Sequence, residues 1–299
     1  MVLNIVSRAV MLLFSGMRRA RVSLLLVATF LFAATSECMA QDSSSETEPC
    51  PRVDIEYQQR SFVSGGKTIG VEQFQPAASG RFPIIVMIHG SGGLLTRRDA
   101  AFPKNDNFGE IRLACRGYVA VLVHYFDRSG ILSTTDEHYM EAESDKWLET
   151  LRAAVDYASL LPKGDTARIG LFGESLGGYL ALALAMQDTR IRAVVEYGGG
   201  IRQREGEDPK KLPPVMILHG DADKIVPPSE AARLAAILEQ NGSAYQTRIF
   251  PGFNHYPSRA ALAEVQEEAI RFFNEYLRRP VHEHKLSEDA SMGIAPRNR

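Results

Sequence analysis

Uninterrupted apolar runs alternate with helical stretches along this chain, and that alternation constrains the fold more than any other feature. Five runs have the composition of strands buried on both faces of a parallel sheet: residues 84–88, 119–123, 169–172, 193–195 and 215–218. Helices are expected over residues 108–115, 145–160, 176–186, 229–239 and 260–277. Amphipathic strands are expected at residues 53–57 and 68–75, and a last strand is expected at residues 245–250. Strand and helix in succession predict a three-layer α/β sandwich with right-handed crossovers.

The strand at residues 169–172 leads into the turn Gly173-Glu174-Ser175-Leu176-Gly177-Gly178, and a helix rich in Ala and Leu follows. This is G-x-S-x-G in the strand–turn–helix context that the motif requires. The sharp turn strains the serine backbone, and the glycines let strand and helix approach closely. A phosphate-binding loop is the alternative, but neither G-x-x-x-x-G-K nor G-x-G-x-x-G is spelled. Ser175 is therefore predicted to be a nucleophile, with Glu174 beside it either tuning it or facing solvent.

A serine hydroxyl needs a base to take its proton and an acid to orient that base. With this turn, the order along the chain is serine, acid, histidine, so the base must follow Ser175. His255 stands in the loop between the last strand and the last helix, within reach of the sheet's carboxyl edge, and we predict that it is the base. His219 ends a strand and is expected to be structural, while His282 and His284 lie in the C-terminal tail.

The segment Gly220-Asp221-Ala222-Asp223 follows the strand at residues 215–218 and supplies two candidate acids. Asp221 is expected to form the turn directly behind Gly220. Asp223 lies further along the loop, where its carboxylate can turn toward His255, so Asp223 is the predicted acid.

The oxyanion of the transition state needs two N–H donors. One is predicted to be the backbone N–H of Leu176, immediately after the nucleophile, and the other comes from the Gly-rich loop that follows residues 84–88. In that loop the donor is either Ser91 or Gly92. The alternative is that these glycines only permit a tight turn.

Taken together, these motifs resemble the dienelactone hydrolase family. The resemblance covers roughly residues 60–279 and rests on residues 89–93, 173–178, 220–227 and 253–255. It implies an α/β-hydrolase fold, with a mostly parallel sheet and helices on both faces, in a single domain. It also favours Asp223 over Asp221, because the family's acid falls three residues past the glycine. The name-giving enzymes use a cysteine nucleophile where Ser175 stands here, and no arginines are recognised that would hold a carboxylated lactone.

The expected activity is that of a serine hydrolase that cleaves carboxylic esters or lactones through an acyl-enzyme on Ser175. No metal and no cofactor are expected, because the histidines lack ligand spacing. Tyr125 and Phe126 follow the strand at residues 119–123; either they line the acyl pocket or they cover the core. Two other functions remain open: a serine peptidase of the prolyl-oligopeptidase type, and a catalytically silent binding protein on the same fold.

Charge and composition exclude other classes of protein. Basic and acidic residues number 34 and 36 with no long run of one sign, so no nucleic-acid partner is expected. The 45% hydrophobic content is that of a globular protein. A small ester molecule is the expected partner, and the oligomeric state is not predicted.

The N-terminal segment has the layout of a signal peptide. Arg18, Arg19 and Arg21 precede an uncharged apolar run at residues 22–34, and cleavage is expected after Ala40. We therefore expect export to the periplasm or medium, with no other membrane association; the alternative is an uncleaved anchor. The predicted parts are a signal peptide (1–40), a flexible N-terminus (41–52), the hydrolase domain (53–279) and a disordered tail (280–299). Cys50 and Cys115 either form a disulfide or leave Cys115 simply buried.

Overall fold

The computed structural model describes residues 54–94, 109–202 and 208–278. The predictions for the signal peptide, the flexible N-terminus and the C-terminal tail with its two histidines lie outside the described residues. Cys50 also lies outside them, whereas Cys115 is disulfide-bonded. The pairing of these two cysteines therefore stays a prediction. In the described ranges, no helix combines the length and the apolar character needed to span a bilayer.

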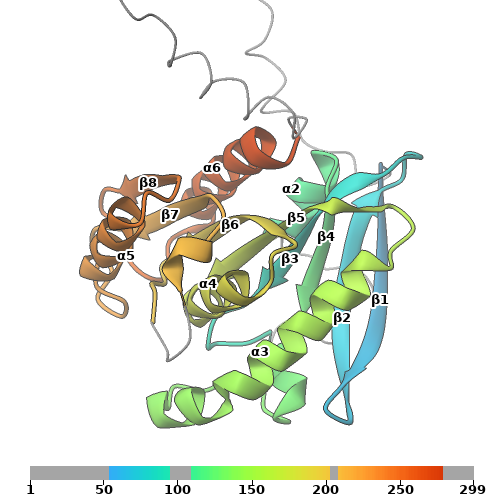
Figure 1. The fold of residues 1–299 in the computed structure, drawn as a ribbon, viewed down its shortest axis with the longest axis horizontal. Coiled ribbons are helices and arrows are strands. Elements are labelled where there is room, and N and C mark those ends of the chain that lie inside the picture. Colours follow the sequence, from blue (N-terminus) through green and yellow to red (C-terminus); the bar gives the residue numbers. More distant parts are fainter. Residues whose placement is uncertain (1–53, 95–108, 203–207, 279–299) are drawn as a thin grey trace, which may run out of the picture. The chain divides into compact units, whose positions relative to one another are not determined.

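The described elements build an eight-stranded sheet (Figure 1). Its strands are β1 (Ile55–Ser64), β2 (Lys67–Pro76), β3 (Phe82–Ile88), β4 (Val119–Val123), β5 (Gly164–Glu174), β6 (Ile191–Tyr197), β7 (Val215–Gly220) and β8 (Tyr245–Phe250). Their order across the sheet is β1-β2-β4-β3-β5-β6-β7-β8. The β1–β2 and β2–β4 pairs are antiparallel, and every other neighbouring pair is parallel. This arrangement confirms the predicted α/β-hydrolase fold.

Helices cover both faces of the sheet, as Figure 1 shows. The helices are α2 (Glu110–Cys115), α3 (Glu137–Ser159), α4 (Leu176–Gln187), α5 (Ser229–Gln240) and α6 (Arg259–Leu277), with short 3₁₀ turns η2 (Tyr125–Arg128) and η3 (Pro209–Lys211). One apolar cluster joins α3, α4 and α5 to the sheet, and a second joins α2 and α6 to it. The three predicted layers are therefore present.

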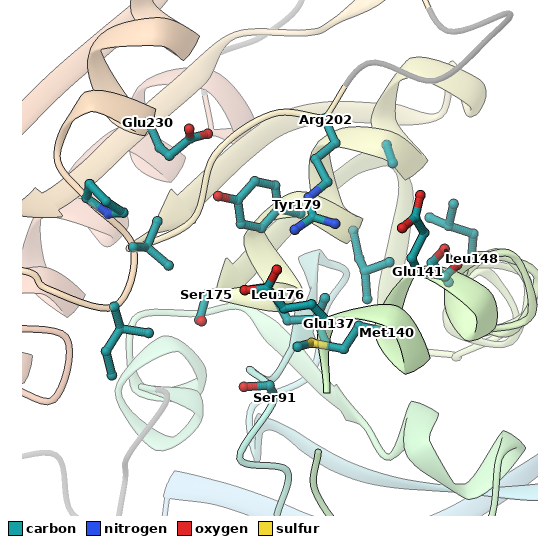
Figure 2. A pocket seen from close by; sticks show the side chains of 16 residues that line it. Ser91, Glu137, Met140, Glu141, Leu148, Ser175, Leu176, Tyr179, Arg202 and Glu230 are labelled. Carbon is teal, nitrogen blue, oxygen red and sulfur yellow. Dashed lines mark hydrogen bonds between the residues drawn. The ribbon is translucent and has the colours of Figure 1, made fainter. Parts of the chain in front are cut away.

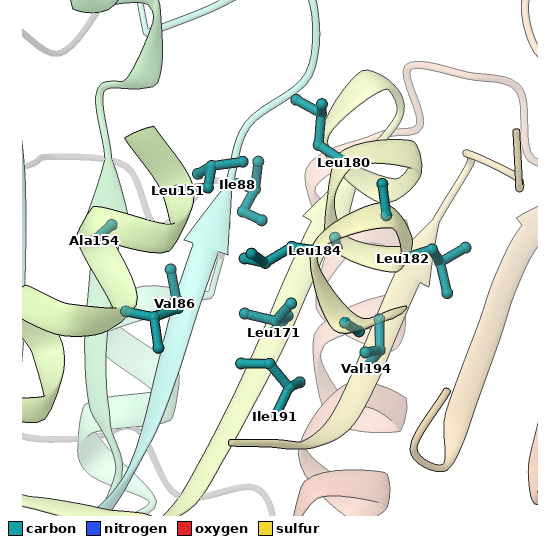
Figure 3. Close-up of a cluster of buried hydrophobic side chains, with 14 of the residues drawn as sticks. Val86, Ile88, Leu151, Ala154, Leu171, Leu180, Leu182, Leu184, Ile191 and Val194 are labelled. Atoms are coloured by element: carbon teal, nitrogen blue, oxygen red, sulfur yellow. The ribbon is translucent and has the colours of Figure 1, made fainter. Parts of the chain in front are cut away.

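Alternation along each central strand fills both clusters, because successive side chains point to opposite faces of a sheet. On β3, Val86 and Ile88 belong to the cluster under α3 and α4, whereas Ile85 and Met87 belong to the cluster under α6. All four are fully buried. Figure 3 shows the first cluster, in which Leu184 of α4 lies over the sheet. A strand buried on both faces explains the uninterrupted apolar run in the sequence.

The start of α3 differs most from the one expected. The helix α3 begins at Glu137, a full two turns before Asp145, because the Asp136 side chain accepts hydrogen bonds from the backbone N–H groups of His138 and Tyr139. The first turns of α3 are polar, so they lack the apolar period that reveals a helix in the sequence. Helix α5 begins at Ser229 as expected, and Pro228 occupies its N-cap position without a side-chain cap.

Candidate active site

Ser175 is the single residue between the end of β5 and the start of α4. Its backbone has φ 52° and ψ −119°, and among the described residues it is the only one other than glycine with a positive φ. Two neighbouring glycines make the turn sterically possible. A Cβ on Gly173 would overlap the backbone of Gly177, and a Cβ on Gly177 would overlap the carbonyl group of Ile88. The turn therefore presents the serine at the carboxyl edge of the sheet, at the N-terminal end of α4.

The structure brings together the three side chains that were predicted to react. Nε2 of His255 lies 3.0 Å from Oγ of Ser175, and Nδ1 of His255 lies 2.7 Å from Oδ2 of Asp223. All three side chains are buried. Because a carboxylate only accepts hydrogen bonds, Nδ1 of His255 carries the proton and Nε2 is free to accept one from Ser175. This is the geometry that turns a hydroxyl into a nucleophile.

The carboxylate of Asp223 is held in place on its other side. Its Oδ1 accepts hydrogen bonds from the backbone N–H groups of Ile225 and Val226, at 2.8 and 2.9 Å. The buried ring of His219 donates from Nε2 to the carbonyl oxygen of Val226 at 2.9 Å, which fixes the same loop. Asp221, the other candidate acid, instead accepts from the backbone N–H of Gly252 at 2.6 Å in the loop that carries His255.

The loop after β3 approaches the nucleophile closely. A Cβ on Gly90 would lie 3.2 Å from Cβ of Ser175, so a larger residue would crowd the serine. Buried His89 shapes this loop: burial lowers its pKa to about 3, and Nδ1 of the neutral ring donates to the carbonyl oxygen of Gly90 at 2.8 Å. The predicted oxyanion donors lie beside Ser175, since Ser91 and Leu176 line one cavity with it and Ser91 and Gly92 line another.

The first cavity has a volume of about 270 Å³ and extends from Ser175 toward α3 (Figure 2). Apolar residues of α3, α4 and the Asp223 loop line it, among them Met140, Leu180 and Val226. The charged residues of its lining are Glu137, Glu141, Arg202 and Glu230. Figure 2 shows Ser175 and Ser91 on one side of the lining and Leu148 on the other.

A second cavity, of about 380 Å³, also borders the nucleophile. It is lined by the loop Gly90–Gly93, by Glu174 and Ser175, and by the segment His255–Pro257 with Leu262 of α6. Burial raises the pKa of Glu174 to about 7. Its carboxyl group makes no hydrogen bond or ion pair with any described residue. Because both cavities border the nucleophile, they provide room for the two parts of a substrate that lie on either side of the bond under attack.

The model of the dienelactone hydrolase family matches residues 69–277, well over half of the chain. The chain belongs to this family. The resemblance stated from the motifs is therefore confirmed, and the match includes all the residues assembled around Ser175.

Curated relatives match over shorter segments. The quorum-quenching protein AidA of Acinetobacter baumannii (strain MDR-ZJ06) is 34% identical over 122 residues, which are 41% of this chain and 37% of that protein. The carboxymethylenebutenolidase of Pseudomonas putida is 30% identical over 126 residues, which are 38% of this chain and 53% of that enzyme. The chain therefore spans only about a third to a half of these relatives' lengths.

A solved structure shows the same fold. The dienelactone hydrolase from Anabaena variabilis ATCC 29413 superposes with a TM-score of 0.55 at 20% identity. The superposition covers 75% of this chain and 100% of that one. At this identity the likeness concerns the fold alone.

Tyr125 and Phe126 line neither of the two cavities beside Ser175. Of the two alternatives for these residues, the structure therefore favours covering the core over lining the acyl pocket. Both are buried in the core. The ring of Tyr125 stacks on His89 at 4.2 Å between centroids, its hydroxyl donates to the carbonyl oxygen of His89 at 3.0 Å, and Phe126 packs edge-on against the same ring. The two aromatic residues therefore support the loop that carries the predicted oxyanion donors.

Sequence reasoning missed most of the cavity lining. Tyr179 and Leu180 lie one turn into α4, while Glu137 and Met140 lie on a part of α3 that was not predicted to be helical. Only the helical spacing after Ser175 offered a signal, because it places residue 179 on the same side of the helix as the serine. Among the described residues, no group of His, Cys, Asp and Glu is arranged to hold a metal ion.

Proposed function

We propose that the protein is an exported serine hydrolase that cleaves carboxylic esters or lactones through an acyl-enzyme on Ser175. The observation that carries the proposal is the unbroken chain of hydrogen bonds from Ser175 through His255 to Asp223, at 3.0 and 2.7 Å. The family membership adds esters and lactones as the substrate class, because the similar Pseudomonas protein is a carboxymethylenebutenolidase.

In the first half of the reaction, Oγ of Ser175 attacks the carbonyl carbon while its proton passes to Nε2 of His255. The backbone N–H of Leu176 and one from the loop of Ser91 and Gly92 stabilise the oxyanion. The carbon–oxygen bond to the alcohol then breaks, and His255 returns the proton to the departing oxygen. Asp223 keeps the imidazole in the required tautomer and stabilises the imidazolium.

Water completes the cycle. A water molecule loses its proton to Nε2 of His255 and attacks the acyl-enzyme, and the bond from the acyl carbon to Ser175 breaks as the serine recovers that proton. The products are the carboxylic acid, the alcohol and the free enzyme. A lactone gives one hydroxy acid instead, because its acid and alcohol halves are joined.

Labelling with a fluorophosphonate tests this mechanism. The wild-type enzyme is expected to gain one phosphonyl group by mass, Ser175→Ala none, and the wild type alone is expected to hydrolyse a panel of esters graded in acyl length. An aminoacyl peptide substrate belongs in the panel, because faster turnover of it would favour the peptidase. If the folded wild type shows neither labelling nor turnover, the alternative of a catalytically silent binding protein would replace the hydrolase proposal.

Export is supported by two features. The arginines, the apolar run at residues 22–34 and the expected cleavage position after Ala40 form a signal-peptide pattern, and Cys115 is disulfide-bonded, which is typical of proteins that fold in an oxidising compartment. Fractionation of expressing cells, with N-terminal sequencing of the product, tests this part. A product that starts at Gln41 in the periplasm or medium is expected, and an uncleaved cytoplasmic chain would contradict it.

A further inference from the structure

The second cavity contains one acidic group that the reaction above does not use. Among the described residues lining this cavity, Glu174 and His255 are the only side chains that are acidic or basic at neutral pH. His255 is engaged with Ser175 and Asp223, whereas the carboxyl group of Glu174 has no hydrogen-bond partner in the described part of the chain. Glu174 is half-buried, and burial of a carboxylate without a partner is costly, so a ligand that supplies a positive charge would relieve that cost.

The position of His255 indicates which half of the substrate enters this cavity. The imidazole must hand its proton to the departing alcohol oxygen, so the alcohol half leaves on the side where the imidazole is accessible. His255 lines the second cavity and does not line the first. The alcohol half therefore occupies the second cavity, and the acyl half extends along the first cavity toward α3.

Tyr256 gives this cavity a second feature suited to a cation. The residue is 69% exposed and lines the cavity, and its ring stands edge-on to the ring of His255 at 5.0 Å between centroids. The face of an aromatic ring attracts an ammonium group, and a nearby carboxylate adds to that attraction. No lysine or arginine is present among the described lining residues to compete for Glu174.

We propose that the second cavity selects esters whose alcohol half carries a cationic ammonium group, with Glu174 as the specificity-determining residue and Tyr256 as its aromatic partner. The proposal rests on the serine hydrolase function proposed above. It predicts that a carboxylate on the alcohol half is rejected, because that group would lie beside Glu174 without a counter-charge. The chemistry at Ser175 is unchanged: the same carbon–oxygen bond breaks, and the ammonium group only positions the alcohol.

The groups around Glu174 determine the pH at which this selection operates. Tyr125 of η2 and Tyr197 of β6 face it, and their pKa values are raised first by burial and then by the charge of Glu174, so both phenols stay neutral. His89 is neutral as well, and His255 faces the same cavity. Because burial raises the pKa of Glu174 to about 7, assays at pH 8.5 measure its ionised form.

The experiment compares three butyrate esters of similar size, made with 2-(trimethylammonio)ethanol, with its neutral isostere 3,3-dimethylbutanol and with glycolic acid as the anionic alcohol. Release of butyric acid is followed by titration at pH 8.5, and kcat/KM is measured for the wild type, Glu174→Gln and Glu239→Gln. Glu239 is an exposed carboxylate on α5 that lines neither cavity, so its replacement removes the same charge elsewhere.

The wild type is expected to prefer the cationic ester over its isostere by about tenfold, the factor that one partly buried charge-assisted contact supplies. Glu174→Gln should bring that ratio close to one, and Glu239→Gln should leave it at the wild-type value. Should Glu174→Gln fail to fold, competitive inhibition of neutral-ester hydrolysis by tetramethylammonium ion tests the same contact in the wild type.

The results separate the two proposals. Hydrolysis of the neutral ester that requires Ser175, with equal kcat/KM for the cationic ester and no inhibition by tetramethylammonium, would overturn the cation selectivity alone. A ratio that survives in Glu174→Gln would overturn the role of that residue. Absence of Ser175-dependent hydrolysis of all three esters would overturn the serine hydrolase proposal, and the cation selectivity with it.

Discussion

Replacing the nucleophile with glycine should make the folded protein more stable than replacing it with alanine. Ser175→Ala removes Oγ and its hydrogen bond to His255 but keeps Cβ, whereas Ser175→Gly removes both. The two variants therefore share the loss of the hydroxyl and differ only in Cβ. Since φ is 52° at this residue, the difference between them reports the strain of holding a side chain in that conformation.

The magnitude follows from two opposing contributions. A non-glycine residue in a sparsely populated region of positive φ costs about 1–3 kcal/mol. Glycine loses about 0.5–1 kcal/mol more conformational entropy on folding than alanine does. Ser175→Gly should therefore exceed Ser175→Ala by about 1 kcal/mol in free energy of unfolding, or about 2–4 °C in Tm for a domain of this size.

Urea denaturation followed by circular dichroism measures the difference. Ala232→Gly is the matched control, because Ala232 is exposed on α5 with ordinary helical geometry, and there the change should cost about 1 kcal/mol. The strain argument is refuted if Ser175→Gly is less stable than Ser175→Ala by the same amount as this control. Both variants at residue 175 are expected to lack esterase activity.

Two further predictions concern the acids around the nucleophile. Asp223→Asn should lower kcat by about 10⁴-fold, because the amide no longer enforces the tautomer with Nδ1–H in His255; an unchanged kcat in the correctly folded variant would remove Asp223 from the mechanism. Burial raises the pKa of fully buried Glu196 to about 8 from its ordinary value of 4.5, so between these pH values the folded protein keeps a proton that the unfolded chain releases. The free energy of unfolding should then fall as pH rises, by up to about 1.4 kcal/mol per pH unit from this group. Urea denaturation at pH 5 and pH 8 should show a smaller fall in Glu196→Gln, and equal falls would contradict the argument.

Most of the sheet could be predicted because its strands are buried on both faces. The fully buried strand β4 begins and ends at the residues expected from its apolar run. The edge strand β8 also has the expected bounds, although most of its side chains are not buried. Ser175, Asp223 and His255 each follow the carboxyl end of one of the parallel strands, and those ends lie at the same edge of the sheet. That rule places β5, β7 and β8 in positions where their loops meet, and the structure has the three side chains in hydrogen-bond contact.

The lining of the two cavities could not be predicted in the same way. It depends on how the first turns of α3 lie against α4, and those turns begin at a side-chain cap on Asp136 rather than at an apolar repeat. Tyr125 and Phe126 follow a strand at the correct edge, but a 3₁₀ turn directs them into the core. A residue's place just after the carboxyl end of a strand therefore predicted the region of the site. It did not predict which side chains in that region face the substrate.

Several energetically costly features lie at the ends of β5 and β6. Ser175 is strained, Glu174 has no partner among the described residues, and Oε1 of Glu196 is buried without one. Glu196 is linked to the nucleophile through its turn: its Oε2 accepts the backbone N–H of Gly199 at 2.9 Å, and a Cβ on Gly199 would lie 2.8 Å from the carbonyl oxygen of Ser175. If this turn holds the serine in place, Glu196→Gln should change stability and kcat together, whereas a purely structural acid would change stability alone. The backbone neighbours of Ser175 thus hold this residue in its strained conformation. Because replacement by glycine relieves that strain, its effect should appear in the free energy of unfolding of the whole domain.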